Sequence, residues 1–161
     1  MRIGVVSDTH NHLRNVERIV ELFHAADVAH VIHTGDITQP KTLAALSALR
    51  VPLCGVYGNN DLERQGLEQA ARQYGMTWRD PPLQLVLASR RIVVVHDPRD
   101  LGRLAPNSYD VALHGHIHRR VIERSEGRLV FNPGECAGHL PGHNAVGVVD
   151  LTNLETEILR F

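Results

Sequence analysis

Cysteine is scarce in this sequence of 161 residues, and long hydrophobic runs are missing from it. The two cysteines, Cys54 and Cys136, form no C-x-x-C motif, so we expect two reduced thiols that behave as small apolar groups. The first ten residues already include the acidic Asp8, which argues against a signal peptide, and no apolar run approaches the length of a membrane span. These features predict a cytoplasmic protein that does not enter a membrane.

An excess of charge of either sign is also missing, since the net charge is −1 with neutral histidines. A nearly neutral chain without a basic run argues against nucleic acid and anionic membranes as partners. The contents of hydrophobic residues (43%) and charged residues (22%) are ordinary for a globular protein. The length suits one domain, and we expect it to span residues 1–161 because no linker or repeat interrupts the chain.

The first half of the chain alternates β-strands with α-helices. The expected strands are short and rich in β-branched residues, as is typical of buried strands, and they lie at residues 2–7, 30–34 and 51–58. The expected helices show apolar residues at helical spacing or begin at a proline, and they lie at residues 13–23, 40–49 and 62–74. This order predicts a parallel sheet with helical crossovers.

The second half predicts hairpins instead of crossovers. Three segments each carry a turn between two strand-like runs, and they lie at residues 83–96, 120–132 and 145–161. Their turns are expected near Ser89–Arg90, Glu126–Gly127 and Thr152–Asn153. Another short strand is expected within residues 111–115. An α/β half followed by hairpins indicates either one mixed sheet or two sheets packed together.

Polar side chains follow five of the expected strands at the point where each strand ends. They are Asp8, His10, Asp36, Asn59, His96, His116 and His118. Ligands of open α/β sheets bind at the carboxyl ends of the strands, so we expect these seven residues to form one site. Each motif alone is a weak or moderate signal, since three alternate histidines also occur on surfaces and in cores. Five such groups, each after a strand, are much harder to attribute to chance.

The ligand types of these seven residues indicate a metal centre. All of them offer nitrogen or oxygen and none offers a thiolate, which suits Mn²⁺, Fe²⁺, Zn²⁺, Co²⁺ or Ni²⁺. Seven ligands are too many for one tetrahedral ion and fit two ions that share a carboxylate. Two ions roughly 3.5–4 Å apart form the usual clamp for displacement at phosphorus. Gly35, Gly58 and Gly115 each precede a candidate ligand and let the backbone come close to an ion.

The remaining histidines are expected to have other roles. His33 and His114 lie inside strands and point away from the ligand set, so we expect them in the core or behind the metal ligands. The others are expected on the surface or in loops, and they are His12, His24, His30, His139 and His143.

With these motifs in this order, the sequence resembles the calcineurin-like metallophosphoesterases. The resemblance is carried by SDTHN at 7–11, GD at 35–36, GNND at 58–61, His96, GHIH at 115–118 and FNPGE at 131–135. It runs over essentially the whole chain. The nearest group is that of the small phosphodiesterases similar to YfcE and MJ0936.

The resemblance implies an α/β fold in which two mixed β-sheets pack as a sandwich flanked by helices. It also implies two divalent transition-metal ions bridged by Asp36, with Mn²⁺ favoured and Ni²⁺, Fe²⁺, Co²⁺ or Zn²⁺ as alternatives. One ion would be held by Asp8, His10, Asp36 and His118, and the other by Asp36, Asn59, His96 and His116. A hydroxide between the ions would attack phosphorus while both ions stabilise the charge on the phosphoryl oxygens. Asn11 is a candidate contact to the substrate.

Two positions depart from the family pattern. Asn60 stands where many members have a histidine that assists the leaving group, and an amide cannot supply a titrating proton. We therefore treat Asn60 as a candidate catalytic position with altered chemistry. Asp97 follows His96 where many relatives have glycine, and its carboxylate could orient the imidazole, change the ion preference or face solvent.

The sequence is compatible with three functions. The presence of all seven ligand positions favours a metal-dependent phosphodiesterase that acts on a small phosphoester. A protein-binding scaffold like the retromer subunit Vps29 shares the resemblance but has no need for a complete ligand set. A nuclease shares the motifs, but the nearly neutral charge argues against it. The short chain leaves little room for a capping domain, so we expect an open site, and homo-oligomers would be consistent with the group.

Overall fold

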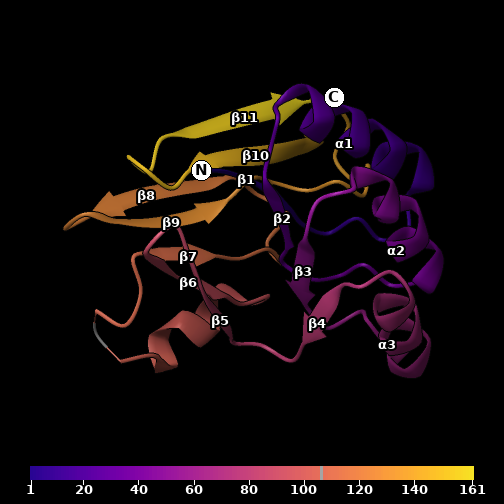
Figure 1. Ribbon diagram of the computed structural model, residues 1–161, viewed down its shortest axis with the longest axis horizontal. Coiled ribbons are helices and arrows are strands. Elements are labelled where there is room, and N and C mark those ends of the chain that lie inside the picture. Colours follow the sequence, from indigo (N-terminus) through magenta and orange to yellow (C-terminus); the bar gives the residue numbers. More distant parts are fainter. Residues whose placement is uncertain (106) are drawn as a thin grey trace.

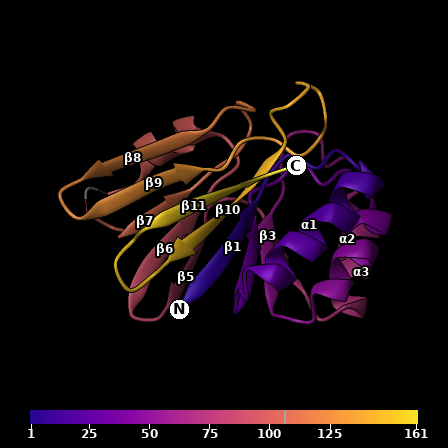
Figure 2. The same ribbon diagram turned by 90° about the horizontal axis from the view of Figure 1, so that it is seen from above.

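The computed structural model describes residues 1–105 and 107–161, which form three layers (Figure 1). Figure 2 shows the α-helices on one side of a first β-sheet and a second β-sheet on its other side. This arrangement confirms the expected α/β fold with two mixed sheets flanked by helices.

The first sheet has six strands in the order β11-β10-β1-β2-β3-β4. Their bounds are β1 Arg2–Val6, β2 His30–His33, β3 Leu53–Val56, β4 Thr77–Arg79, β10 Ala145–Asp150 and β11 Thr156–Arg160. Strands β1 to β4 are parallel, whereas β10 pairs antiparallel with β1 and β11 pairs antiparallel with β10. The carboxyl ends of β1, β2 and β3 therefore lie at the same edge.

The second sheet has five strands in the order β5-β6-β7-β9-β8. Their bounds are β5 Leu83–Leu87, β6 Arg90–Val94, β7 Val111–Leu113, β8 Val121–Ser125 and β9 Arg128–Asn132. The central strands β6, β7 and β9 are parallel, and β5 and β8 pair antiparallel at the two borders. The predicted hairpins are confirmed as β5–β6, β8–β9 and β10–β11.

Apolar side chains fill the space between the sheets and the space under the helices. Ile3 and Val5 from the first sheet join Leu113 and Phe131 from the second in one buried cluster. The helices α1 (Leu13–Ala25), α2 (Pro40–Leu46) and α3 (Arg64–Gln73) cover the outer face of the first sheet. These two cores hold the sheets together and leave the loops at their common edge free to carry polar residues.

Several boundaries differ from the sequence-based expectation. Strand β4 was not predicted, because it has only three residues and only Trp78 among them is buried. The second helix leaves α-geometry after Leu46 and ends in a short 3₁₀ turn, η1 Ser47–Leu49. The turn of the first hairpin lies one residue earlier than expected, at 88–89. A 3₁₀ segment, η2 Pro98–Arg103, was also missed.

Both cysteines are free and buried, as expected for two small apolar groups. Burial raises the pKa of the Cys54 thiol to about 11, so this thiol stays protonated at neutral pH. In the part of the chain that the structure describes, no helix has the length and apolar character needed to span a bilayer.

Candidate metal centre

The loops that follow β1, β2, β3, β6 and β7 meet at one edge of the sandwich. The structure brings all seven predicted ligands together there, and they are Asp8, His10, Asp36, Asn59, His96, His116 and His118. Three of the strands belong to the first sheet and two to the second. The site therefore depends on how the two sheets pack against each other.

Asp36 lies at the middle of this group and is almost fully buried. Its Oδ2 is 3.4 Å from His10 Nε2 on one side and 3.5 Å from His96 Nε2 on the other. Burial alone would raise the pKa of Asp36, but hydrogen bonds from His96 and Asn60 lower it well below its usual range. Asp36 is therefore an ionised carboxylate between two sets of ligands, as a bridging ligand requires.

The first set contains Asp8, His10 and His118. One oxygen of Asp8, Oδ2, accepts hydrogen bonds from the Ser7 hydroxyl and from the backbone N–H of His116. Its other oxygen, Oδ1, lies 3.6 Å from His118 Nε2. Among the described residues, Asp8 Oδ1 and His10 Nε2 are buried polar atoms without a hydrogen-bond partner. Unsatisfied buried atoms that converge in this way fit a bound cation.

The second set contains Asn59, His96 and His116. His96 Nδ1 lies 2.9 Å from the carbonyl oxygen of Thr34, so it donates its N–H there and leaves Nε2 to face the site. His96 Nε2 lies 2.9 Å from Asn59 Oδ1 and 3.3 Å from His116 Nδ1. Asn59 Oδ1 is also 3.0 Å from His116 Nδ1. In the ion-free structure these nitrogen and oxygen atoms pair with one another, and each of them is also a possible metal ligand.

The pKa values of His10 and His96, the two histidines beside Asp36, are shifted in opposite directions. Burial lowers the pKa of His10, and the Asp36 carboxylate does not offset this effect. Burial also disfavours the charged form of His96, but Asp36 more than compensates and raises the pKa of His96. In the ion-free protein a proton on His96 can therefore occupy the place of a cation, and metal binding would release it.

The backbone at the ligands is strained. Five non-glycine ligands have left-handed backbone conformations, and their φ angles are 51° at Asp8, 40° at His10, 57° at Asp36, 69° at His116 and 53° at His118. Such conformations are uncommon for residues with a side chain, and they cluster where function demands them. Two glycines allow close packing here, because a Cβ on Gly58 would overlap Asp36 and a Cβ on Gly115 would overlap Ser7.

Asp61 supports the site, although the sequence analysis assigned it no role. Its side chain is buried and accepts three backbone hydrogen bonds, from the N–H groups of Asp36 (3.1 Å), Thr38 (2.6 Å) and Gly58 (2.7 Å). It thereby joins the loop after β2 to the loop after β3. Burial raises the pKa of Asp61, even though these N–H donors act in the opposite direction. In the sequence, the place of Asp61 at the end of the GNND motif is the feature that could have indicated this supporting role.

Two further residues near His118 were also missed. Glu135 is buried, and its Oε2 lies 3.7 Å from His118 Nδ1, so a buried carboxylate faces the second nitrogen of this candidate ligand. His139 is an exposed loop residue, as expected, but its ring lies beside His10 and His118 with centroid distances of 5.1 and 5.3 Å. No spacing in the sequence indicates this position of His139, because the loop that carries it is placed by contacts distant along the chain.

The other predicted residues have identifiable contacts. The Asn60 side chain donates to Asp36 Oδ2 at 2.7 Å, and its backbone N–H donates to Asp36 Oδ1 at 2.9 Å. Asn11 Oδ1 accepts a hydrogen bond from Thr42, so its expected contact to substrate stays a prediction. The Asp97 carboxylate pairs with Arg99, which lowers the pKa of Asp97 to about 2.

Two histidines outside the ligand set are buried, as predicted. His33 Nδ1 accepts a hydrogen bond from the N–H of Gly35 at 3.1 Å, and His33 Nε2 lies 3.1 Å from Thr9 Oγ1. His114 Nδ1 lies 3.4 Å from the side-chain amide of Asn132. His33 therefore supports the turn that carries Asp36, and His114 belongs to the core of the second sheet.

Comparison with known proteins agrees with this geometry. The family model of the calcineurin-like phosphoesterase superfamily domain matches residues 1–154. Phosphodiesterase MJ0936 of Methanocaldococcus jannaschii is 33% identical over 159 residues, which cover 96% of each chain. Phosphodiesterase YfcE of Escherichia coli K12 is 27% identical over 85% of this chain and 80% of its own.

Solved structures with the same fold include a phosphodiesterase and a Vps29. The structure of an archaeal phosphodiesterase superposes with a TM-score of 0.92 at 32% identity and covers all of both chains. Vps29 of Entamoeba histolytica, in a complex with Zn²⁺, superposes with a TM-score of 0.70 at 15% identity and covers 100% of this chain and 98% of its own. The second similarity concerns the fold alone.

Proposed function

The chain belongs to the calcineurin-like phosphoesterase superfamily, and from this membership we propose that it is a phosphodiesterase that uses two divalent transition-metal ions. The observation that carries the proposal is the convergence of imidazole nitrogens on Asp36 Oδ2 from both sides. On the first side, Asp8 Oδ1 and His10 Nε2 are also buried without a hydrogen-bond partner among the described residues, which fits a bound cation. The names of the relatives support phosphodiesters as the substrate class.

The proposed division of ligands follows the two sets described above. The first ion would be held by Asp8, His10, Asp36 and His118, and the second by Asp36, Asn59, His96 and His116. When bound, two such ions supply an activated water and stabilise the negative charge that develops on the phosphoryl oxygens. We propose Mn²⁺ as an activating ion because the carboxylate and amide oxygens among the ligands suit it.

The protein itself would orient the ligands. The carbonyl of Thr34 fixes the tautomer of His96, and Glu135 faces the second nitrogen of His118. Asp61 holds the turns on either side of Asp36. These contacts fix ring and carboxylate directions before substrate arrives, which lowers the cost of reorganisation during the reaction.

The surroundings of the site suit an anionic substrate. A cavity of about 460 Å³ opens beside His118, and its lining residues include Arg119, Arg120 and Arg160. Positive charge next to a metal centre attracts a phosphodiester and can accommodate one of its two substituents. We therefore propose a small phosphodiester as substrate. Two buried free thiols agree with a cytoplasmic location.

A scaffold function has to be separated from catalysis by measurement. The Vps29 structure of Entamoeba histolytica contains Zn²⁺, so metal binding to this fold has to be distinguished from turnover. Metal bound without any hydrolysis of phosphodiesters or phosphomonoesters would favour the scaffold. Metal-dependent turnover would favour the enzyme.

Removal of metal is expected to abolish activity, because every proposed ligand binds through nitrogen or oxygen and the metal centre is the only proposed source of the nucleophile. The purified protein should be treated exhaustively with a chelator and assayed on bis(p-nitrophenyl) phosphate. Addition of Mn²⁺ should restore the rate, whereas chelator saturated with metal beforehand should have no effect. Full turnover by metal-free protein would contradict the two-metal proposal.

The substitution Asn60→His is expected to change the dependence of the rate on the leaving group. A general acid contributes typically about 10²–10⁴-fold, and an alkoxide leaving group needs it more than an aryloxide. The variant should therefore gain most on esters with poor leaving groups. The measurement is the slope of log rate against leaving-group pKa for wild type and variant.

The control for this prediction is Asn60→Ala. It removes the hydrogen bond from Asn60 to Asp36 without adding an acid. A rate change that is equal across all esters in Asn60→His, and matches that of Asn60→Ala, would show that Asn60 only positions Asp36.

A further inference from the structure

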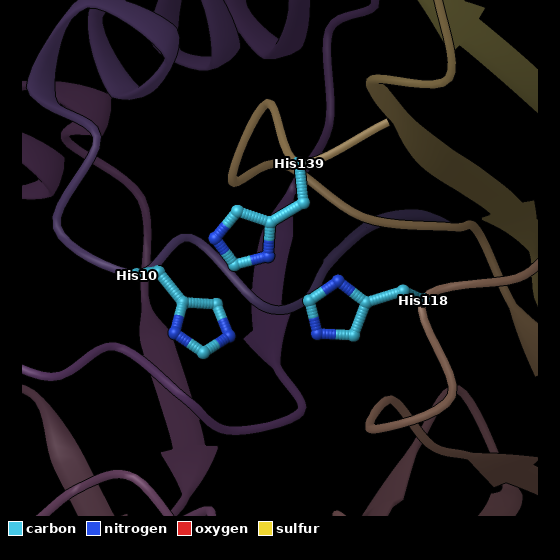
Figure 3. A group of neighbouring side chains, drawn as sticks. All are labelled: His10, His118 and His139. Carbon is cyan, nitrogen blue, oxygen red and sulfur yellow. The ribbon is translucent and has the colours of Figure 1, made fainter. Parts of the chain in front are cut away.

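A third imidazole lies beside the first set of ligands. His10 follows β1, His118 follows β7, and His139 belongs to the loop of residues 133–144 between β9 and β10 (Figure 3). One nitrogen from each ring lies within 4.8 Å of the other two. Figure 3 shows that the three rings come from separate segments and face a common space.

The spacing of the three rings matches that of imidazoles around one ion. The ring centroids are 5.3 Å apart for His10 and His118, 5.1 Å for His10 and His139, and 5.3 Å for His118 and His139. An ion about 2.0–2.1 Å from one nitrogen of each ring, at the angles of about 90–120° found in five-coordinate sites, would place the centroids roughly 4.5–5.5 Å apart. The buried His10 Nε2, which has no hydrogen-bond partner among the described residues, is a second indication of a ligand here.

The loop that carries His139 is fixed relative to His118. Glu135 Oε2 accepts a hydrogen bond from the N–H of Ala137 at 2.8 Å, and Glu135 Oε1 accepts one from the N–H of Leu140 at 2.8 Å. The same carboxylate faces His118 Nδ1 at 3.7 Å. Glu135 therefore positions the chain on both sides of His139 and the ring of His118 together.

We propose that His139 is a further ligand of the ion held by His10 and His118, and that it makes this site select Zn²⁺ over Mn²⁺. The inference rests on the proposed two-metal function. His139 would give this site three imidazoles, against two in the set around His96, and imidazole suits zinc, copper, nickel and iron. The two ions would then differ, with Mn²⁺ at the second site.

The test measures metal binding directly. Metal-free wild type, His139→Ala and His139→Gln are titrated separately with Zn²⁺ and Mn²⁺ against a chromophoric chelator. Co²⁺ absorption in the visible range reports the ligand set. His143→Ala is the matched control, because His143 is exposed in the same loop and lies outside the cluster. Thermal unfolding verifies that each variant is folded.

We expect both His139 variants to lose at least about tenfold in Zn²⁺ affinity at one of two sites, since even residues that only contact metal ligands change affinity by about 10–100-fold. Mn²⁺ affinity should change much less, the Co²⁺ spectrum should change, and His143→Ala should match wild type. Unchanged Zn²⁺ affinity and an unchanged Co²⁺ spectrum in His139→Ala would overturn the role of His139 while leaving the two-metal proposal intact. Absence of metal binding in wild type would instead overturn the proposed function itself.

Discussion

Replacement of Asp36 by asparagine should remove metal from both sites and lower the rate of phosphodiester hydrolysis at least about a thousandfold, because several kcal/mol of transition-state stabilisation depend on the ions. Asp36 Oδ2 lies between His10 and His96, so the lost charge affects both ligand sets. Without it, two cations at close range also repel each other more strongly. The measurements are metal content per chain and rate.

Asp36→Asn has a closely matched control in Asp27→Asn. Both aspartates have left-handed backbones, with φ of 57° and 51°, and asparagine tolerates this conformation. Asp27 is exposed after α1, so its replacement should change neither metal content nor rate. His33→Ala tests the separation of ligands from supporting histidines. Equal metal loss in His33→Ala and Asp36→Asn would contradict that separation.

The substitution Asp61→Ala is expected to lower the stability of the fold strongly. The side chain of Asp61 accepts hydrogen bonds from the N–H groups of Asp36, Thr38 and Gly58 in a buried setting. Without the carboxylate these donors lose their partner, at a cost of about 3–5 kcal/mol in the free energy of unfolding. The midpoint of thermal unfolding should fall by roughly 10 °C.

Asp80→Ala is the control for this effect. Asp80 pairs with Arg64 at 2.7 Å, but its side chain is 80% exposed, so its removal should change the unfolding free energy by less than about 1 kcal/mol. Metal content also separates two roles of Asp61. A stable Asp61→Ala variant with full metal content would mean that water replaces the carboxylate. The turns around Asp36 would then keep their conformation without Asp61.

The sequence predicts well which polar residues meet at the edge of the sandwich, because they follow a local rule. Asp8, Asp36 and Asn59 each come two or three residues after a parallel strand, and buried β-branched runs make those strands easy to find. Parallel strands then bring the residues to one edge without any further information. The same reasoning extends to the ligands after β6 and β7.

Features that depend on contacts distant along the chain could not be predicted in this way. The loop at 133–144 is placed by Glu135, whose carboxylate binds backbone groups of its own loop and faces His118. Nothing in the spacing of His139 indicates that its ring reaches His10. Likewise, β4 is too short to show a period, and only its pairing with β3 makes it a strand.

The left-handed backbone of five proposed ligands has an evolutionary consequence. Each non-glycine residue in such a conformation costs on the order of 1 kcal/mol, and five of the proposed ligands at this edge adopt it. Glycine at these positions would relieve the strain but would remove side chains of the proposed site, so selection for a metal-dependent reaction would have to maintain them. In a lineage that no longer needed the reaction, the ligands would be replaced early, and the sandwich would become more stable as its chemistry disappeared.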